Sequence, residues 1–274
     1  MQYFRYETRK KKVTLYPLVC MHIGAKQADE DFIREHVKRI ADDPDGLWVY
    51  LGDGGECVTK ASKGELYEQR LSPDEQIDHL VELLEPIRGR GLFGVSGNHD
   101  RRIAKLSGLD WTHALCARLG IPYMGVSVFM RLALHPKGAS SHTAAFDLFW
   151  HHGTDSSSLL AGKVRAAKKL EDLVEADAIF SAHSHICMDA PPTYRAFLDQ
   201  KAQGVRYREM RTFVCGCAYD SRIPGYAEEK GYSPILPSYL GVTFGVLRDR
   251  KQTKSEVYDL MRPHVECQIW RKPV

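Results

Sequence analysis

The stretch Gly91-Leu92-Phe93-Gly94-Val95-Ser96-Gly97-Asn98-His99-Asp100 joins a short apolar run to a polar cluster. Its first half predicts a buried β-strand, and the glycine and asparagine that follow predict a turn. Amide, imidazole and carboxylate groups can bind metal ions or move protons. In open α/β sheets, ligands bind where strands end and loops begin. The stretch therefore predicts an α/β fold that presents functional side chains at the end of a strand.

Four other apolar runs lead into similar polar clusters. One histidine at a strand end is more often a satisfied polar residue than a ligand, and Gly-Asp alone is usually a turn. The five clusters together hold six of the twelve histidines, however, so coincidence explains them poorly. His183 and His185 are the strongest pair, because residues i and i+2 of an extended chain face the same side. The four further clusters are Cys20-Met21-His22, Gly52-Asp53, His151-His152-Gly153 and His183-Ser184-His185.

Helical patterns fall between several of the expected strands. Ser72-Pro73-Asp74-Glu75 matches a capping box with proline at the first helical position. The alternation of strand and helix predicts an α/β layer architecture. The expected strands are Val13–Ile23, Leu47–Leu51, Gly91–Val95, Leu148–Trp150 and Ala178–Ser181, and the expected helices are Asp31–Ile40, Ser72–Arg88, Trp111–Leu119 and Leu159–Val174. Three later strands, Met210–Ala218, Leu240–Leu247 and Val257–Ile269, predict a second sheet, whereas Ala190–Val205 and Pro224–Pro237 have the composition of surface loops.

Length and composition place the 274-residue chain among globular proteins. Hydrophobic residues make up 43% and charged residues 27%, and the net charge of +3 excludes a general polyanion binder. Seven cysteines, an odd number scattered along the chain, indicate free thiols in a reducing compartment. Met1–Lys12 lacks the apolar core of a signal peptide, and no apolar run is long enough to cross a bilayer. We expect a cytoplasmic protein.

The ordered motifs resemble those of the calcineurin-like metallophosphoesterase superfamily. That family carries D-x-H, G-D, G-N-H-[DE], H-G and G-H-x-H in this order, and the resemblance runs from Cys20 to His185. It implies a four-layer α/β/β/α sandwich of two mixed β-sheets flanked by helices. It also implies a single domain over residues 1–274, with a helical insertion at about 60–90 and a β-rich part at about 206–270. Within Ala61–Tyr123, the runs Leu66-Tyr67-Glu68-Gln69, Ser72-Pro73 and Leu119–Tyr123 are also similar to a subgroup common in phages and prophages.

The resemblance implies a site with two divalent metal ions and a catalytic histidine. A hydroxide that bridges the metals would attack phosphorus, and His99, oriented by Asp100, would stabilise the developing charge or protonate the leaving group. Arg101 and Arg102 either bind a phosphate oxygen or form a solvated pair at a helix start. The implied metal ligands are Cys20, His22 and His185 on one ion, Asn98, His152 and His183 on the other, and Asp53 between them. His152 is favoured over His151 because the family places glycine directly after this ligand.

Two positions depart from the family pattern. Ala182 replaces a glycine, which changes backbone freedom but removes no ligand. Cys20 replaces an aspartate. A thiolate is a softer ligand than a carboxylate, so among manganese, zinc and iron it would favour zinc or iron at the first site. Alternatively, Cys20 only packs at the strand end and leaves that site weak.

Three functions are compatible with these residues. The first is hydrolysis of a phosphodiester, or of a phosphomonoester, by a metal-dependent enzyme. The second is a nuclease of the same superfamily, which needs basic residues along a nucleic-acid backbone. The third is a non-catalytic metal-binding interaction module. Candidate basic residues for the nuclease are Lys60, Lys63, Arg70, Arg88 and Arg90, and Lys163, Arg165, Lys168 and Lys169. The tyrosine-rich segment Tyr219–Tyr239 is expected either to cap the pocket or to contact a second subunit.

Overall fold

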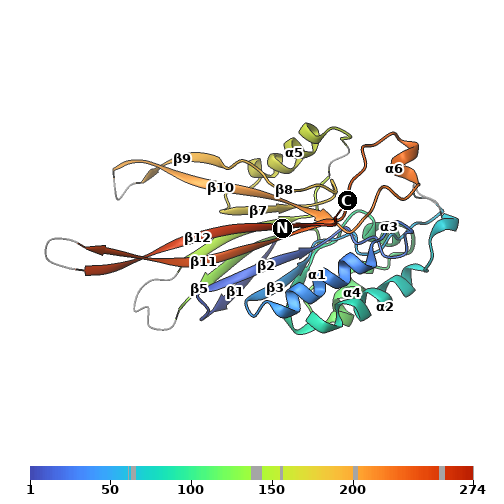
Figure 1. Cartoon of the computed structure of the whole chain (residues 1–274), viewed down its shortest axis with the longest axis horizontal. Coiled ribbons are helices and arrows are strands. Elements are labelled where there is room, and N and C mark those ends of the chain that lie inside the picture. Colours follow the sequence, from blue (N-terminus) through green and yellow to red (C-terminus); the bar gives the residue numbers. More distant parts are fainter. Residues whose placement is uncertain are drawn as a thin grey trace.

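The structure is a computed structural model that describes residues 1–60, 62, 66–136, 144–154, 157–199, 203–252 and 257–273. It is a mixed α/β chain with a large curled sheet (Figure 1). The strands are β1 Gln2–Thr8, β2 Lys12–Leu18, β3 Gly46–Tyr50, β4 Gly91–Gly94, β5 Ser127–Leu134, β6 Ala144–His151, β7 Ala178–Ser181, β8 Cys187–Asp189, β9 Thr193–Asp199, β10 Gly204–Cys217, β11 Ser238–Gln252 and β12 Val257–Arg271. The helices are α1 Glu30–Asp42, α2 Pro73–Leu84, α3 Asp100–Ser107, α4 Trp111–Leu119, α5 Leu160–Lys168 and α6 Tyr226–Glu229, with 3-10 turns η1 Leu66–Glu68, η2 Glu85–Arg90 and η3 Lys169–Asp172.

The sheet has two leaves that share one junction. The strand order is β1-β5-β6-β7-β10-β11-β2-β3-β4, with β12 on β11 and with β8 and β9 on β10. The leaves meet where β10 pairs with β11 through only two residue pairs, Gly216 with Tyr239 and Cys217 with Ser238. Gly216 has a φ of +82°, and a Cβ there would lie 1.9 Å from the Ser238 carbonyl oxygen. Two separate sheets were expected, but the structure joins them, because a glycine lets the backbones approach at this point.

All four expected helices are present, and three of them, α1, α2 and α4, begin at a side-chain cap. The Asp29 side chain accepts a hydrogen bond from the Phe32 N–H and caps α1. Ser72 and Glu75 form the expected capping box at the start of α2. Leu159–Val174 is shorter than predicted as a helix, since α5 ends at Lys168 and continues only as η3. Figure 1 shows α1, α2, α3 and α4 gathered at one end of the molecule.

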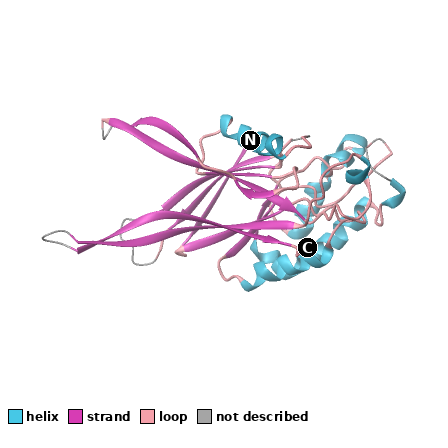
Figure 2. Ribbon diagram, turned by 45° about the horizontal axis from the view of Figure 1, so that its top comes forward, coloured by secondary structure: helices cyan, strands magenta, loops and turns pink. Residues whose placement is uncertain are grey.

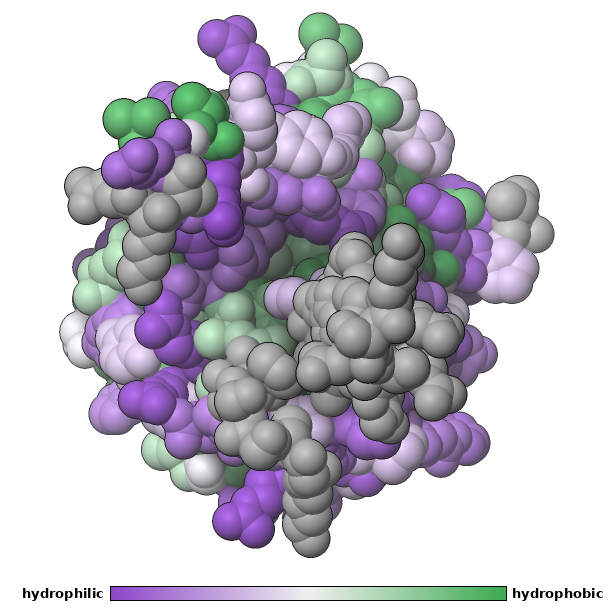
Figure 3. All heavy atoms as spheres, turned by 90° about the vertical axis from the view of Figure 1, so that its left-hand side faces the viewer, coloured by the Kyte–Doolittle hydropathy of each residue, from purple (hydrophilic) through white to green (hydrophobic). Residues whose placement is uncertain are grey.

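The prediction that Ala190–Val205 forms a surface loop is wrong. Thr193–Asp199 is strand β9 and pairs with the first half of β10 to form an antiparallel ribbon. Hydrogen bonds to β10 stabilise β9 in this ribbon. The prolines at the start of Ala190–Val205 gave no reason to expect such a partner strand. Figures 1 and 2 show this ribbon and the β11–β12 ribbon projecting from the end opposite α1–α4. Seen from that end, polar residues cover much of the described surface, and apolar residues gather mainly near the top (Figure 3).

A large apolar core lies between the two leaves. Trp150 and Phe180 stack at 3.8 Å between ring centroids, and Phe146 meets Phe244 of the other leaf at 5.0 Å. No helix in the described part of the chain is both long and apolar enough to span a membrane. Strands β2, β3 and β4 run parallel to one another, as do β6 and β7. Their carboxyl ends bring the polar clusters of the sequence to one region of the molecule.

Candidate active site

The backbone at the strand ends adopts a conformation that is unusual for non-glycine residues. Left-handed φ angles occur in only a few per cent of such residues and cluster at functional sites. Backbone hydrogen bonds join the first two clusters, from Cys20 N to Gly52 O at 3.0 Å and from His22 N to Asp53 O at 3.1 Å. The left-handed residues of this region, with φ between +47° and +65°, are Cys20, His22, Asp53, Cys57, His183 and His185.

The first candidate metal group consists of Cys20, His22 and His185. Their ligand atoms lie within 4.8 Å of one another. The Nε2 atoms of His22 and His185 face each other at 3.1 Å. Burial lowers the pKa of both imidazoles, which favours the neutral form that binds metals. The group therefore offers one sulfur and two nitrogen donors to a single ion.

The second candidate group consists of Cys20, Asp53 and His152, so that it shares Cys20 with the first, and a third consists of His22, Glu56 and His99. His152 Nδ1 donates to the Leu51 carbonyl at 2.6 Å, and His152 Nε2 lies 3.0 Å from Asp53 Oδ2. Metal-bound histidines commonly use one ring nitrogen in this way to orient the other. Burial acts to raise the pKa of Asp53, but His152 and His99 outweigh it and hold that pKa well below its usual range.

The adjacent His151 points elsewhere. Its Nδ1 accepts a hydrogen bond from the Gly153 N–H at 2.8 Å, while the ring of His152 contacts Asp53. Asn98 and His183 line the same pocket as Asp53. Among the described residues, His183 lies outside the compact donor groups, with its ring 5.4 Å from that of His152. Five of the seven metal ligands that the family resemblance implies thus lie in the compact donor groups. The other two, Asn98 and His183, line the pocket beside these groups.

Glu56 is a site residue that the sequence interpretation missed. Its Oε2 lies 2.8 Å from His22 Nδ1 and 3.5 Å from His99 Nδ1, and its carbonyl accepts from His99 Nδ1 at 3.0 Å. Burial acts to raise its pKa, but hydrogen bonds to the two histidines outweigh it and lower that pKa. The sequence did contain a signal for this residue, because Glu56 follows Asp53 by three residues and comes directly after two glycines.

Asp100 does not have the contact with the His99 ring that we expected. Its buried carboxylate accepts hydrogen bonds from Asp53 N at 3.0 Å and Gly97 N at 2.9 Å, and also from Tyr50 and Thr112. Burial, with the charge of Asp53, raises the pKa of Asp100 to about 6. The carboxylate beside the His99 ring is that of Glu56, so the assignment of Asp100 as orienting partner is corrected. Asp100 instead stabilises the loops that carry Asp53.

The two arginines after the motif differ in position. Arg102 lines the pocket and donates to Glu56 O at 3.0 Å and to His99 Nε2 at 2.9 Å, whereas Arg101 is exposed. Guanidinium is only a donor, so His99 is neutral in this arrangement. Burial acts to lower the His99 pKa, but Asp53 and Glu56 outweigh it and raise that pKa. Protonation at Nε2 would require Arg102 to move, and Arg102 could then contact a substrate.

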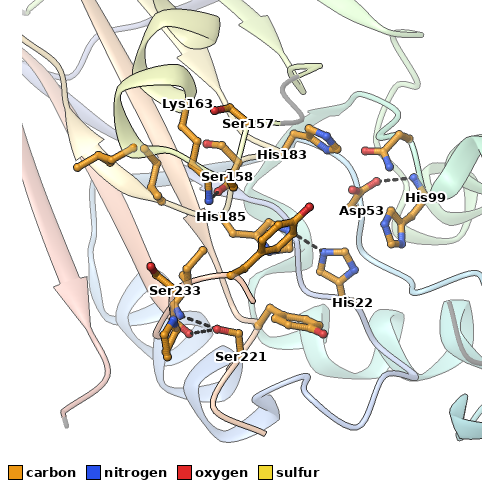
Figure 4. A pocket seen from close by; sticks show the side chains of 18 of the residues that line it. His22, Asp53, His99, Ser157, Ser158, Lys163, His183, His185, Ser221 and Ser233 are labelled. Atoms are coloured by element: carbon orange, nitrogen blue, oxygen red, sulfur yellow. Dashed lines mark hydrogen bonds between the residues drawn. The ribbon is translucent and has the colours of Figure 1, made fainter. Parts of the chain in front are cut away.

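The floor of a pocket of about 710 Å³ is formed by His22, Asp53, Glu56, His99, Arg102 and His185. Figure 4 shows His22, Asp53 and His185 pointing toward its centre, with Lys163 and Ser158 on one side and Ser221 on another. The Tyr219 ring lies 5.5 Å from that of His22 and 5.6 Å from that of His185. Tyr219 and Tyr232 of the tyrosine-rich segment line this pocket, and the contact with a second subunit stays a prediction.

The donor set fits a borderline divalent cation. Sulfur, imidazole nitrogen and carboxylate oxygen together are typical of zinc and iron sites. Burial raises the pKa of the Cys20 thiol well above its usual range, and Asp53 adds to this effect. A bound cation would be needed to remove that proton, as metals do for coordinating thiols. The buried thiol between two histidine-containing groups is therefore suited to a metal.

The basic residues proposed for a nuclease do not gather at this pocket. Arg88 and Arg90 donate to backbone carbonyls, and Lys168 binds Glu171, Pro191 O and Thr193. Lys163 is the candidate among them that lines the pocket, and it donates to Ser184 O at 2.9 Å. Lys63 lies outside the described residues. The described part of the chain thus gives no continuous basic track to the site.

Comparisons with known proteins place the chain near several solved structures without assigning it to a family. No family model matches the chain, and no curated protein matches it either. Vacuolar protein sorting 29 from Cryptosporidium parvum is 13% identical with a TM-score of 0.39, over 94% of this chain and 100% of that one. A single mutant of Vps29 from Entamoeba histolytica is 10% identical with a TM-score of 0.43, over 95% and 100%.

The NAD nucleotidase of Haemophilus influenzae is 10% identical with a TM-score of 0.38, over 93% of this chain and 50% of that one. At these identities and TM-scores, the three likenesses carry no argument about what this chain does. The phage-type subgroup stays a prediction from the sequence.

Proposed function

We propose that this chain is a metal-dependent phosphoesterase that hydrolyses phosphodiesters, with monoesters as the alternative substrate class. One observation carries the proposal: two overlapping donor groups, which share Cys20 and contain His22, Asp53, His152 and His185, lie at a pocket that three of these residues line, His22, Asp53 and His185. The four-layer sandwich and the two-ion site of the metallophosphoesterases belong to the same proposal.

The chemistry needs charge neutralisation at phosphorus. Divalent cations held by these donors would neutralise phosphate oxygens and activate water near neutral pH. Asp53 lies between His99 and His152, since its Oδ1 accepts from His99 N at 2.8 Å and its Oδ2 lies 3.0 Å from His152 Nε2. The carboxylate is thereby oriented before any ligand binds. Asp100, which accepts from Asp53 N, fixes the backbone beneath it.

His99 is the group that assists the leaving oxygen in this proposal. Glu56 O accepts from Nδ1 and so directs Nε2 toward Arg102 and the pocket. A substrate phosphate would attract the Arg102 guanidinium, whose planar fork matches phosphate oxygens. Its departure from His99 would free Nε2 to hold a proton for the leaving oxygen. Arg102, rather than the exposed Arg101, is therefore the proposed substrate ligand.

A nitrophenyl ester assay tests the proposal. The protein, supplied in turn with manganese, zinc or iron, is given bis- and mono-(4-nitrophenyl) phosphate. We expect turnover of the diester, and we expect His99→Ala to lower kcat by about 100- to 10,000-fold, the usual contribution of a positioned acid or base. Metal content should not change in this variant, because His99 is not a proposed ligand.

The matched control is His113→Ala, which removes an exposed histidine of α4. It should leave kcat and metal content unchanged. A metal-loaded protein that hydrolyses neither esters nor DNA would overturn the proposal and favour the metal-binding interaction module.

A further inference from the structure

The outer half of the pocket differs chemically from its floor. Charged and imidazole side chains line the floor, whereas the loop after β10 supplies a wall that rises from Tyr219, beside the ring of His22, to Tyr232 and Ile235. Leu160 of α5 also lines the pocket, and it is 61% exposed, while Tyr232 is 41% exposed. Apolar side chains that stay exposed beside a polar floor indicate a surface meant for an apolar ligand group.

Hydrogen bonds hold this wall in place. Ser221 N donates to Ile235 O at 3.1 Å, and Ile235 N donates to Ser221 Oγ at 2.5 Å. The two ends of the loop are thereby joined, as the dashed lines near Ser221 show in Figure 4. A wall that is ordered in advance loses less conformational entropy when a ligand binds. Ile235 is thus presented to the pocket on a stable support.

On the opposite side, Lys163 positions α5. Its amine donates to the carbonyl of Ser184, which lies between the two histidines of the last cluster. Leu160 precedes Lys163 by three residues, so the two side chains share one face of the helix. The contact to Ser184 therefore also sets the position of Leu160 above the floor.

The charges of the lining residues follow the same division. The carboxylates of Asp53 and Glu56 and the guanidinium of Arg102 are at the floor. Apart from Lys163, which is tied to Ser184, the outer wall among the described residues is formed by hydroxyl, aromatic and aliphatic groups. A volume of about 710 Å³ lies in the range of sites for small organic ligands. A ligand that carried a second charged group besides its phosphate would therefore gain little binding energy from this wall.

We propose that the organic group of the substrate is an uncharged aromatic or apolar ring, held between Leu160 and the wall formed by Tyr219, Tyr232 and Ile235. This inference rests on the proposed phosphoesterase function and names its substrate class. The phosphate binds at the floor and the ring occupies the outer half. Aromatic side chains offer large contact areas and favourable ring packing to such a group.

Binding of two phosphonates tests the inference without turnover. Phenylphosphonate and methylphosphonate carry the same anionic head, and their C–P bonds resist hydrolysis of the ester type. Calorimetric titration of the metal-loaded protein should give an affinity about tenfold higher for phenylphosphonate, in line with apolar contacts of this size. Aminoethylphosphonate, which carries a cationic group, should bind no better than methylphosphonate.

Adjacent leucines provide a matched pair of variants. Leu160→Ala should reduce the preference for phenylphosphonate to about twofold and leave methylphosphonate binding unchanged. Leu159→Ala changes a neighbouring residue that is 71% exposed and does not appear in the pocket lining, so it should keep the full preference. Both substitutions are at exposed positions, and thermal unfolding checks that both variants fold.

The same preparations are assayed with bis-(4-nitrophenyl) phosphate, which separates this inference from the proposed function. Turnover with equal affinity for the two phosphonates, or an equal effect of both leucine variants, would overturn the inference alone. A preference for phenylphosphonate without turnover of any ester would support the apolar wall while overturning catalysis. Neither turnover nor phosphonate binding would overturn both.

Discussion

Histidines are buried in two regions of this molecule, and their surroundings differ. At the strand ends, His22 and His99 contact the carboxylate of Glu56. In α1, His36 lies fully buried among the rings of Tyr239, at 4.6 Å, and Tyr16, at 5.7 Å. The first region therefore surrounds its imidazoles with negative charge and donors, and the second surrounds its imidazole with aromatic carbon.

The difference separates a functional from a structural use of the same side chain. Burial and the nearby Arg39 lower the pKa of His36 to about 3, so it stays neutral in the folded protein. Its Nε2 has no hydrogen-bond partner among the described residues. At the strand ends, burial lowers the pKa of His22 and His185, but carboxylates outweigh burial at His99 and His152 and raise their pKa. Carboxylate partners, which His36 lacks among the described residues, therefore distinguish the candidate site from the buried histidine of α1.

The largest expected effect is at the carboxylate between the donor groups. Asp53→Asn keeps the shape of the side chain but removes its charge, so we expect loss of bound metal and at least about a 1,000-fold loss of phosphoesterase activity. Metal content by mass spectrometry and the nitrophenyl assay measure both. Asp31→Asn, at a side chain that is 95% exposed, is the control and should retain metal and activity. Full metal content in Asp53→Asn would contradict the proposed bridging role.

Glu56→Gln should have the next largest effect. The amide keeps the size of the side chain but loses the charge that faces His22 and His99, and groups that orient metal ligands typically contribute about 10- to 100-fold to affinity or activity. We expect a decrease in this range in kcat and in affinity for the first metal. Glu68→Gln, which alters an exposed glutamate paired with Lys26, should change neither. Equal behaviour of the two variants would remove Glu56 from the site.

The buried imidazole of His36 should make the free energy of unfolding depend on pH. Because the folded-state pKa is about 3 and the ordinary value is 6.5, the unfolded chain binds more protons between these pH values. Stability is therefore lost as the pH falls below about 6.5, by about 2 kcal/mol at pH 5 relative to pH 8. His36→Phe should remove this part of the acid sensitivity. Urea unfolding of both proteins at pH 5 and pH 8 measures it, and an unchanged pH dependence would refute the neutral buried state of His36.

The smallest expected effect concerns metal choice. Cys20 has a φ of +47°, a conformation that aspartate tolerates better than cysteine does. Cys20→Asp should therefore fold, and it should shift the ratio of bound manganese to bound zinc by about tenfold toward manganese, since carboxylate is the harder ligand. Competition between the two ions, read by mass spectrometry, gives the ratio. Cys116→Ala, at a buried cysteine of α4, should keep the original ratio. An unchanged ratio in Cys20→Asp would mean that the thiol only packs.

The predictions from sequence were most accurate where local patterns suffice. The helix Trp111–Leu119 has the predicted bounds, and the capping box of α2 is present, because both depend on neighbouring residues. The prediction of a loop at Ala190–Val205 failed because β9 is stabilised by its pairing with β10. The sequence of a segment that begins with prolines does not indicate such a partner strand. The β1–β5 pairing was missed for the same reason: it joins segments more than a hundred residues apart.

The sequence by itself determined the order and the chemistry of the clusters, because apolar runs that end in glycine, histidine and carboxylate residues define strand ends on their own. Only the tertiary structure decided which carboxylate meets His99, which of His151 and His152 faces Asp53, and which arginine lines the pocket. Those choices depend on backbone angles and on contacts between distant segments. Side-chain direction at a turn is fixed by packing, which residue order alone does not specify.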